Sequence, residues 1–150
     1  MTSSRTAKPP MSTARKATLA AGLFYIGTFV FSIPALPLYD HVVNHTTQFV
    51  HGSGGTTAVL WAGLIEVLTG LTGIGTAVAL YPILKRHGQG RAVGFVASRT
   101  LEAATIVMGV VAVLGVVTLR QDFAGASGAD AAALTTSAHA LVAVKDWTFL

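Results

Sequence analysis

The chain has 150 residues, of which 52% are hydrophobic and only 11% are charged. Soluble domains carry about 25% charged residues, so the composition excludes an ordinary water-soluble protein and favours one domain in a lipid bilayer. The absence of cysteine excludes disulfides, thiolate metal sites and thiol catalysis. The net charge of +4 comes without an aromatic-rich basic patch, so we expect no nucleic-acid partner.

The first 16 residues are polar and basic, which is typical of a disordered cytoplasmic tail. The charge-free run from Ala17 to Tyr39 predicts a first membrane-spanning helix. This run is longer than a signal-peptide core and ends without a small-x-small cleavage site, so we predict that it is retained. Pro34 and Pro37 are expected to kink or end the helix near the outer surface.

Two further spans are predicted at 57–84 and 92–119, joined by a short basic loop. The segment 40–56 before them is polar and holds no Lys or Arg, as expected of an outer loop. The apolar stretch 131–150 predicts the start of a fourth span. A span that enters near Leu141 has only ten residues left, so we interpret the chain as truncated there. Residues 17–150 therefore form one all-α transmembrane bundle.

The basic residues predict the orientation of this bundle. Seven of them lie in the tail and the second loop, against one, Arg120, in the two outer loops: Arg5, Lys8, Arg15, Lys16, Lys85, Arg86 and Arg91. Because cytoplasmic loops are enriched in Lys and Arg, the N-terminus is predicted to be cytoplasmic.

Charged residues inside predicted spans are the candidate functional residues, because a charge in hydrocarbon is costly unless it is paired or hydrated. Glu66 lies in the second span. It either binds a proton, cation or polar ligand, or it makes a structural hydrogen bond. Arg99 and Glu102 share one helix face at the i,i+3 spacing. They form a self-neutralising pair, or Arg99 binds an anion. The two acids lie at different depths, which excludes a catalytic dyad.

The end of the sequence adds a charged pair and an aromatic anchor. Lys145 and Asp146 are interpreted as a neutral pair at the outer mouth, and the alternative is that Lys145 reaches Glu66. Trp147 is interpreted as an interfacial anchor.

His41 and His45 have the i,i+4 spacing of a helical metal pair, beside Asp40 and His51. Because glycines favour a flexible loop and no firm third ligand is evident, we predict no metal and no cofactor. A different pattern, the small residues Thr69, Gly73 and Ala77 at i, i+4 and i+8, predicts close helix packing.

Several motifs together resemble the bacterial membrane family known as domain of unknown function 4386. These are Gly63–Glu66, Gly75–Leu84, Arg99–Glu102 and Lys145–Leu150, together with the opening residues 15–17, 22–25 and 28–34. The resemblance implies a multi-span protein of the bacterial inner membrane that continues beyond the Asp-Trp-Thr segment. It implies motif positions at Glu66, Arg99, Glu102, Asp146 and Trp147, but no activity, and the loop histidines fall outside them.

Two functional hypotheses follow. The first is a membrane protein that binds or transports a small ligand or ion through its intramembrane polar residues. The alternative is a structural or regulatory protein that packs against a membrane-protein partner or a second copy through its small-residue face. An enzyme is less favoured, because no nucleophile or metal accompanies Glu66 or Glu102.

Overall fold

The computed structural model describes residues 11–149; most of these residues are helical and none of them lies in a strand. Short turns join the helices. In chain order the elements are α1 (Thr13–Asn44), α2 (Thr46–Val50), α3 (Thr56–Leu84), the 3-10 helix η1 (Lys85–His87), α4 (Gln89–Phe123) and α5 (Ala129–Phe149).

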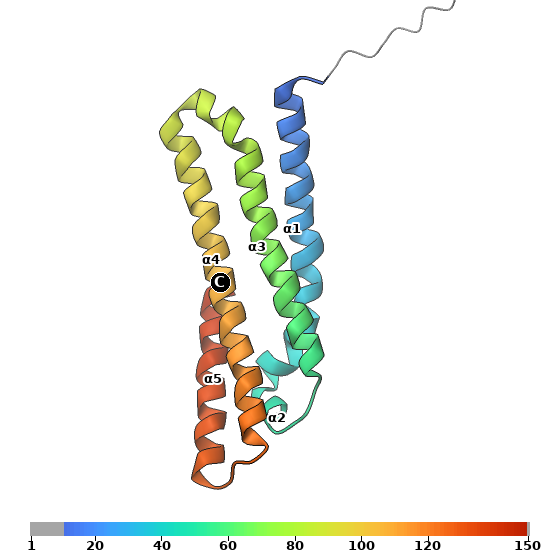
Figure 1. Cartoon of the computed structure of the whole chain (residues 1–150), viewed down its shortest axis with the longest axis vertical. Coiled ribbons are helices and arrows are strands. Elements are labelled where there is room, and N and C mark those ends of the chain that lie inside the picture. The colour runs from blue at the N-terminus through green and yellow to red at the C-terminus, as the bar shows by residue number, and fades with distance from the viewer. Residues whose placement is uncertain (1–10, 150) are drawn as a thin grey trace, which may run out of the picture.

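The long helices form an antiparallel bundle in which sequence neighbours are also neighbours in space. α1 packs on α3, α3 on α4, and α4 on α5, as Figure 1 shows. The short helix α2 lies at one end of the bundle and contacts α1, α4 and α5. We call this the α2 end and the opposite one the η1 end.

Three helical segments of the described chain are long and apolar enough to cross a membrane: Thr13–Asn44, Thr56–His87 and Gln89–Phe123. This confirms the predicted all-α bundle with three full spans. α5 has 21 residues but is not among these segments. Large side chains such as Leu23, Ile33 and Val111 are more than half exposed on the outside of the bundle, as a lipid-facing surface requires.

The helix that contains the first predicted span extends beyond that span at both ends. Ser12 caps α1 by accepting a hydrogen bond from the Arg15 backbone N–H at 3.3 Å, so residues 13–16 of the predicted tail are helical. Residues 1–10 of that tail lie outside the described residues. α1 also continues through Pro34 and Pro37 to Asn44. Prolines are tolerated in spanning helices whose freed carbonyls find other partners, so neither proline ends α1.

The predicted loop 40–56 is largely helical as well. Asp40 to Asn44 belong to the last turns of α1, and α2 follows after His45. Phe49 and Val50 of α2 are almost fully buried, and they join a core that includes Val42, Val59 and Val116. Burial of these apolar side chains stabilises a segment whose local composition favours a loop.

Arg120 of α4 holds the remaining turn in place. Its guanidinium donates hydrogen bonds to the carbonyls of Gly52, Ser53 and Gly54 at 2.7–3.0 Å and lies 4.5 Å from the centre of the Phe49 ring. The planar guanidinium fork suits such a set of acceptors. The turn after α2 is thereby fixed to α4.

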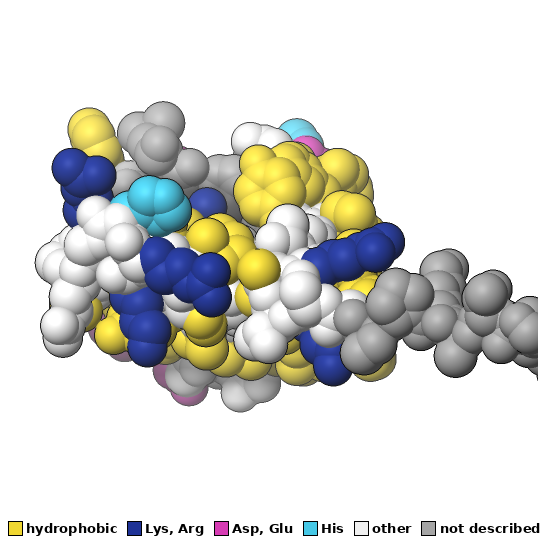
Figure 2. All heavy atoms as spheres, turned by 90° about the horizontal axis from the view of Figure 1, so that it is seen from above, with side chains coloured by type: hydrophobic (Ala, Val, Ile, Leu, Met, Phe, Trp, Pro, Cys, Tyr) yellow, Lys and Arg dark blue, Asp and Glu magenta, His cyan; other side chains and the backbone are white. Residues whose placement is uncertain are grey.

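Basic side chains gather at the η1 end. Figure 2 looks onto this end and shows Lys and Arg side chains around a hydrophobic middle. They belong to the start of α1 and to the α3–α4 connection: Arg15, Lys16, Lys85, Arg86 and Arg91. Five of the seven residues that gave the predicted charge bias therefore lie at one end of the bundle, and the other two, Arg5 and Lys8, lie outside the described residues.

Candidate ligand-binding site

Glu66 is the centre of a buried polar group in the middle of the bundle. It lies on α3, about 15 Å from the first residue of that helix by helical rise, and it is 3% exposed. One carboxylate oxygen accepts a hydrogen bond from the Tyr39 hydroxyl at 2.8 Å. The other pairs with the Lys145 ammonium, which also lies 4.9 Å from the centre of the Tyr39 ring. Three helices, α1, α3 and α5, thus supply one side chain each.

Two glycines lie next to this group. A Cβ at Gly63, one turn before Glu66, would lie 3.7 Å from the Tyr39 hydroxyl and 3.2 Å from Val110. A Cβ at Gly109 of α4 would lie 3.1 Å from Cδ of Lys145 and would collide with the Thr148 hydroxyl. Within the described residues every buried side-chain nitrogen and oxygen has a hydrogen-bond partner. The charges of Glu66 and Lys145 are therefore both buried and hydrogen-bonded, as buried charges require.

The position of α5 corrects one interpretation of the sequence. Lys145 is 5% exposed and pairs with Glu66, so the neutral Lys145–Asp146 pair at the surface was wrong and the stated alternative holds. Trp147 is 78% exposed. Because α5 begins at Ala129, Trp147 lies about 27 Å along it. The helix therefore starts well before Leu141, where the sequence suggested membrane entry.

A pocket of about 590 Å³ opens beside the ion pair, between α1 and α5. Its polar lining combines the Tyr39–Glu66–Lys145 group with Asp40, Asn44 and Asp146. Its apolar wall comes from α1: Ala35, Leu36, Pro37 and Val43. The volume is that of a pocket for a small organic molecule.

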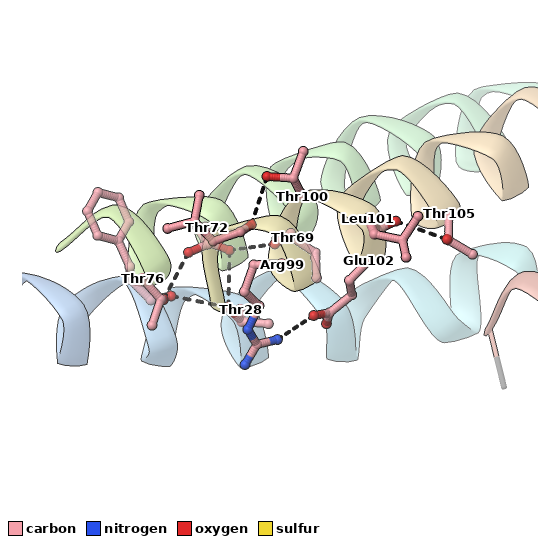
Figure 3. A network of polar contacts seen from close by, with 11 residues as sticks. Thr28, Thr69, Thr72, Thr76, Arg99, Thr100, Leu101, Glu102 and Thr105 are labelled. Carbon is pink, nitrogen blue, oxygen red and sulfur yellow. Dashed lines mark hydrogen bonds and ion pairs between the residues drawn. The ribbon is translucent and has the colours of Figure 1, made fainter. Parts of the chain in front are cut away.

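Arg99 and Glu102 form a second polar region, nearer the η1 end. Their side chains make the predicted i,i+3 ion pair at 2.6 Å, with 26% and 50% of the side chains exposed. Threonines lie beside them, as Figure 3 shows. Thr28 of α1 and Thr72 of α3 share a hydrogen bond at 3.2 Å, and Thr72 and Thr76 each donate to a carbonyl of their own helix. The charge of Arg99 is already balanced, so this geometry favours the structural interpretation over an anion site.

Glu66 and Glu102 have separate partners, which agrees with the expectation that they form no dyad. The small-residue stripe faces the inside of the chain, where Thr69 and Ala77 are buried. A Cβ at Gly73 would meet nothing within 4 Å. A close contact between α3 and α4 lies at Gly70, whose Cβ would lie 3.3 Å from the side chain of Ala103.

Sequence reasoning missed Tyr39 altogether. It lies in the first span, which carries no charge to draw attention, and only the fold brings it to α3. A signal did exist for Lys145, since it is the one basic residue of the last apolar stretch and a lone intramembrane acid needs a partner.

The three long apolar helices define a helical membrane protein, in which a buried ion pair lies beside a pocket between α1 and α5. The chain belongs to the family described as domain of unknown function 4386, which it matches over residues 20–150. This confirms the resemblance found in the sequence. No curated protein and no solved structure matches the chain.

Proposed function

We propose that this membrane protein binds a small apolar cation in the pocket between α1 and α5. The observation that carries the proposal is the combination of an apolar wall with an excess of acidic groups. Asp40, Glu66 and Asp146 line the pocket against one base, Lys145, which gives a formal charge of −2. A pocket with few polar groups and a net negative charge selects ligands that are both apolar and positive.

The roles of the lining residues follow from their positions. Glu66 and Lys145 neutralise each other at the floor, so they fix the shape of the pocket rather than its charge. Asp40 and Asp146 are exposed and supply the excess negative charge. The exposed carboxylates are therefore the ones that select the charge of the ligand.

A matched pair of ions tests this charge selection. Tetraphenylphosphonium and tetraphenylborate have nearly the same shape and opposite charges. In nanodiscs of zwitterionic lipid we expect the cation to bind above the level of empty nanodiscs and the anion not to. Removing one partly screened charge, as in Asp146→Asn, should weaken cation binding about fivefold to tenfold.

Asp130→Asn is the control, because Asp130 is an exposed acid in the first turn of α5, outside the pocket. Equilibrium dialysis measures the binding of both ions to the wild type and of the cation to the Asp146→Asn and Asp130→Asn variants. Equal binding of the two ions, or an Asp146→Asn variant that binds as the wild type does, would contradict the proposal.

The partner-binding alternative has less support. The residues on which it was based, Thr69, Gly73 and Ala77, lie between helices of this chain, and Gly73 lines a small void with Thr28 and Arg99. Thr69 and Ala77 are buried, so of these three residues only Gly73, which is partly exposed, could contact a second protein.

We infer further that the η1 end faces the cytoplasm and that the membrane is a bacterial inner membrane. The basic cluster at that end supports the orientation. Because the chain has no cysteine, single cysteines can report it. In intact cells a membrane-impermeant maleimide should label Ser127→Cys, in the α4–α5 turn, and leave His87→Cys unlabelled until the cells are opened. The reverse pattern would invert the orientation.

A further inference from the structure

Three metal-ligating side chains come together at the α2 end, outside the Glu66 group. Asp40, His41 and His45 each offer a ligand atom, and these three atoms lie within 4.8 Å of one another. All three residues are exposed. The sequence alone lacked a third ligand and suggested a flexible loop. The structure supplies Asp40 as the third ligand and places the group at the end of α1.

We propose that Asp40, His41 and His45 bind one divalent transition-metal ion. Two imidazoles and one carboxylate form a ligand set that suits zinc, and Co²⁺ can take the same place. Ligand bonds of about 2.0–2.1 Å put tetrahedral ligand atoms about 3.3–3.5 Å apart. The ligand atoms therefore need to approach one another by up to about 1.4 Å, which exposed side chains can do by small rotations.

Neighbouring residues already orient two of the ligands. The Asn44 amide donates a hydrogen bond to Oδ1 of Asp40 at 2.9 Å, which leaves Oδ2 for an ion. The His41 ring packs so closely on Gly54 that a Cβ there would collide with it, and Gly54 has a φ of +75°. A hydrogen bond such as that from Asn44 to Asp40, which orients a metal ligand without touching the metal, typically strengthens metal binding.

The support for His41 extends to α4. Arg120 holds the carbonyls of Gly52, Ser53 and Gly54, so the backbone against which His41 packs is itself fixed. His45 completes the group, with its ring centre 5.6 Å from that of His41 in an edge-to-face arrangement. The cluster is thus held by α1 and by a turn fixed to α4, and it shares Asp40 with the lining of the proposed cation pocket.

Cobalt absorption tests this site on the full chain, purified without a histidine tag. Wild-type protein should bind one Co²⁺ per chain, with visible d–d bands that Zn²⁺ abolishes. His41→Ala and His45→Ala should each weaken Co²⁺ binding at least about tenfold, since they remove a ligand. Asp40→Asn should weaken it as well.

His87→Ala is the matched control, because His87 is an exposed histidine at the η1 end, and it should bind as the wild type does. Equal melting temperatures without metal show that the variants are folded. The proposal is overturned if the wild type shows no d–d bands, or if the cluster variants bind as tightly as the wild type.

Discussion

Lys145→Met should lower the free energy of unfolding by about 3–5 kcal/mol, because it leaves the Glu66 carboxylate buried without its cation. The Tyr39 hydrogen bond remains, but one hydroxyl cannot replace an ammonium inside a membrane. Unfolding in mixed micelles of dodecyl maltoside and SDS, followed by circular dichroism, measures this loss.

A double variant separates the charge from the packing. Glu66→Gln with Lys145→Met removes both charges, and it should recover most of the stability lost in Lys145→Met alone. Lys16→Met is the control, because Lys16 is exposed at the start of α1, and it should change stability by less than about 0.5 kcal/mol. The single variant Glu66→Gln completes the comparison. If the stability losses of Glu66→Gln and Lys145→Met simply added in the double variant, the ion pair would not be the stabilising unit described here.

Gly70→Leu should have the second large effect, a loss of about 2–3 kcal/mol from forcing α3 and α4 apart. A Cβ at Gly70 would lie 3.3 Å from the Cβ and 3.5 Å from the Cα of Ala103, and backbone cannot move aside as a flexible side chain can. The same micelle titration measures the effect.

Gly94→Leu is its control. Gly94 is an exposed glycine on α4, and a Cβ there would meet nothing within 4 Å. Leucine also has the higher helix propensity, so this variant should be neutral or slightly stabilised. A Gly70→Leu protein as stable as Gly94→Leu would show that α3 and α4 do not pack at Gly70.

The sequence was sufficient for α1, α3 and α4, since each contains a long and mostly apolar run. It was insufficient at the α2 end, where the outcome depends on tertiary burial. Phe49 and Val50 turn a polar segment into a helix by burying against α4 and α5. The prolines of α1 could not be placed either, because only the packed bundle determines whether a helix continues through them.

The candidate site was predictable in part. Glu66 was identified because a carboxylate in a hydrocarbon span is costly unless it is paired or hydrated. Its partner Lys145 was left as an alternative, because its depth depends on where α5 begins. In the structure α4 ends at Phe123 and α5 begins at Ala129. Lys145 therefore lies far enough along α5 to reach the level of Glu66. The apolar stretch 131–150 marks the start of α5 closely, but the sequence placed membrane entry near Leu141, which left Lys145 at the outer mouth.

The contact between α4 and α5 also determines how the ammonium is positioned. Leu141, Lys145 and Thr148 form one ridge on α5, and the ridge lies over Gly115 and Gly109 of α4. The position of the Lys145 ammonium along the bundle is therefore determined by the packing of α5 on Gly109 and Gly115 of α4, not by the length of the turn between α4 and α5. Extra residues in that turn would leave the charge where it is. One residue inserted between Leu141 and Lys145 would rotate it by about 100° and carry it away from Glu66.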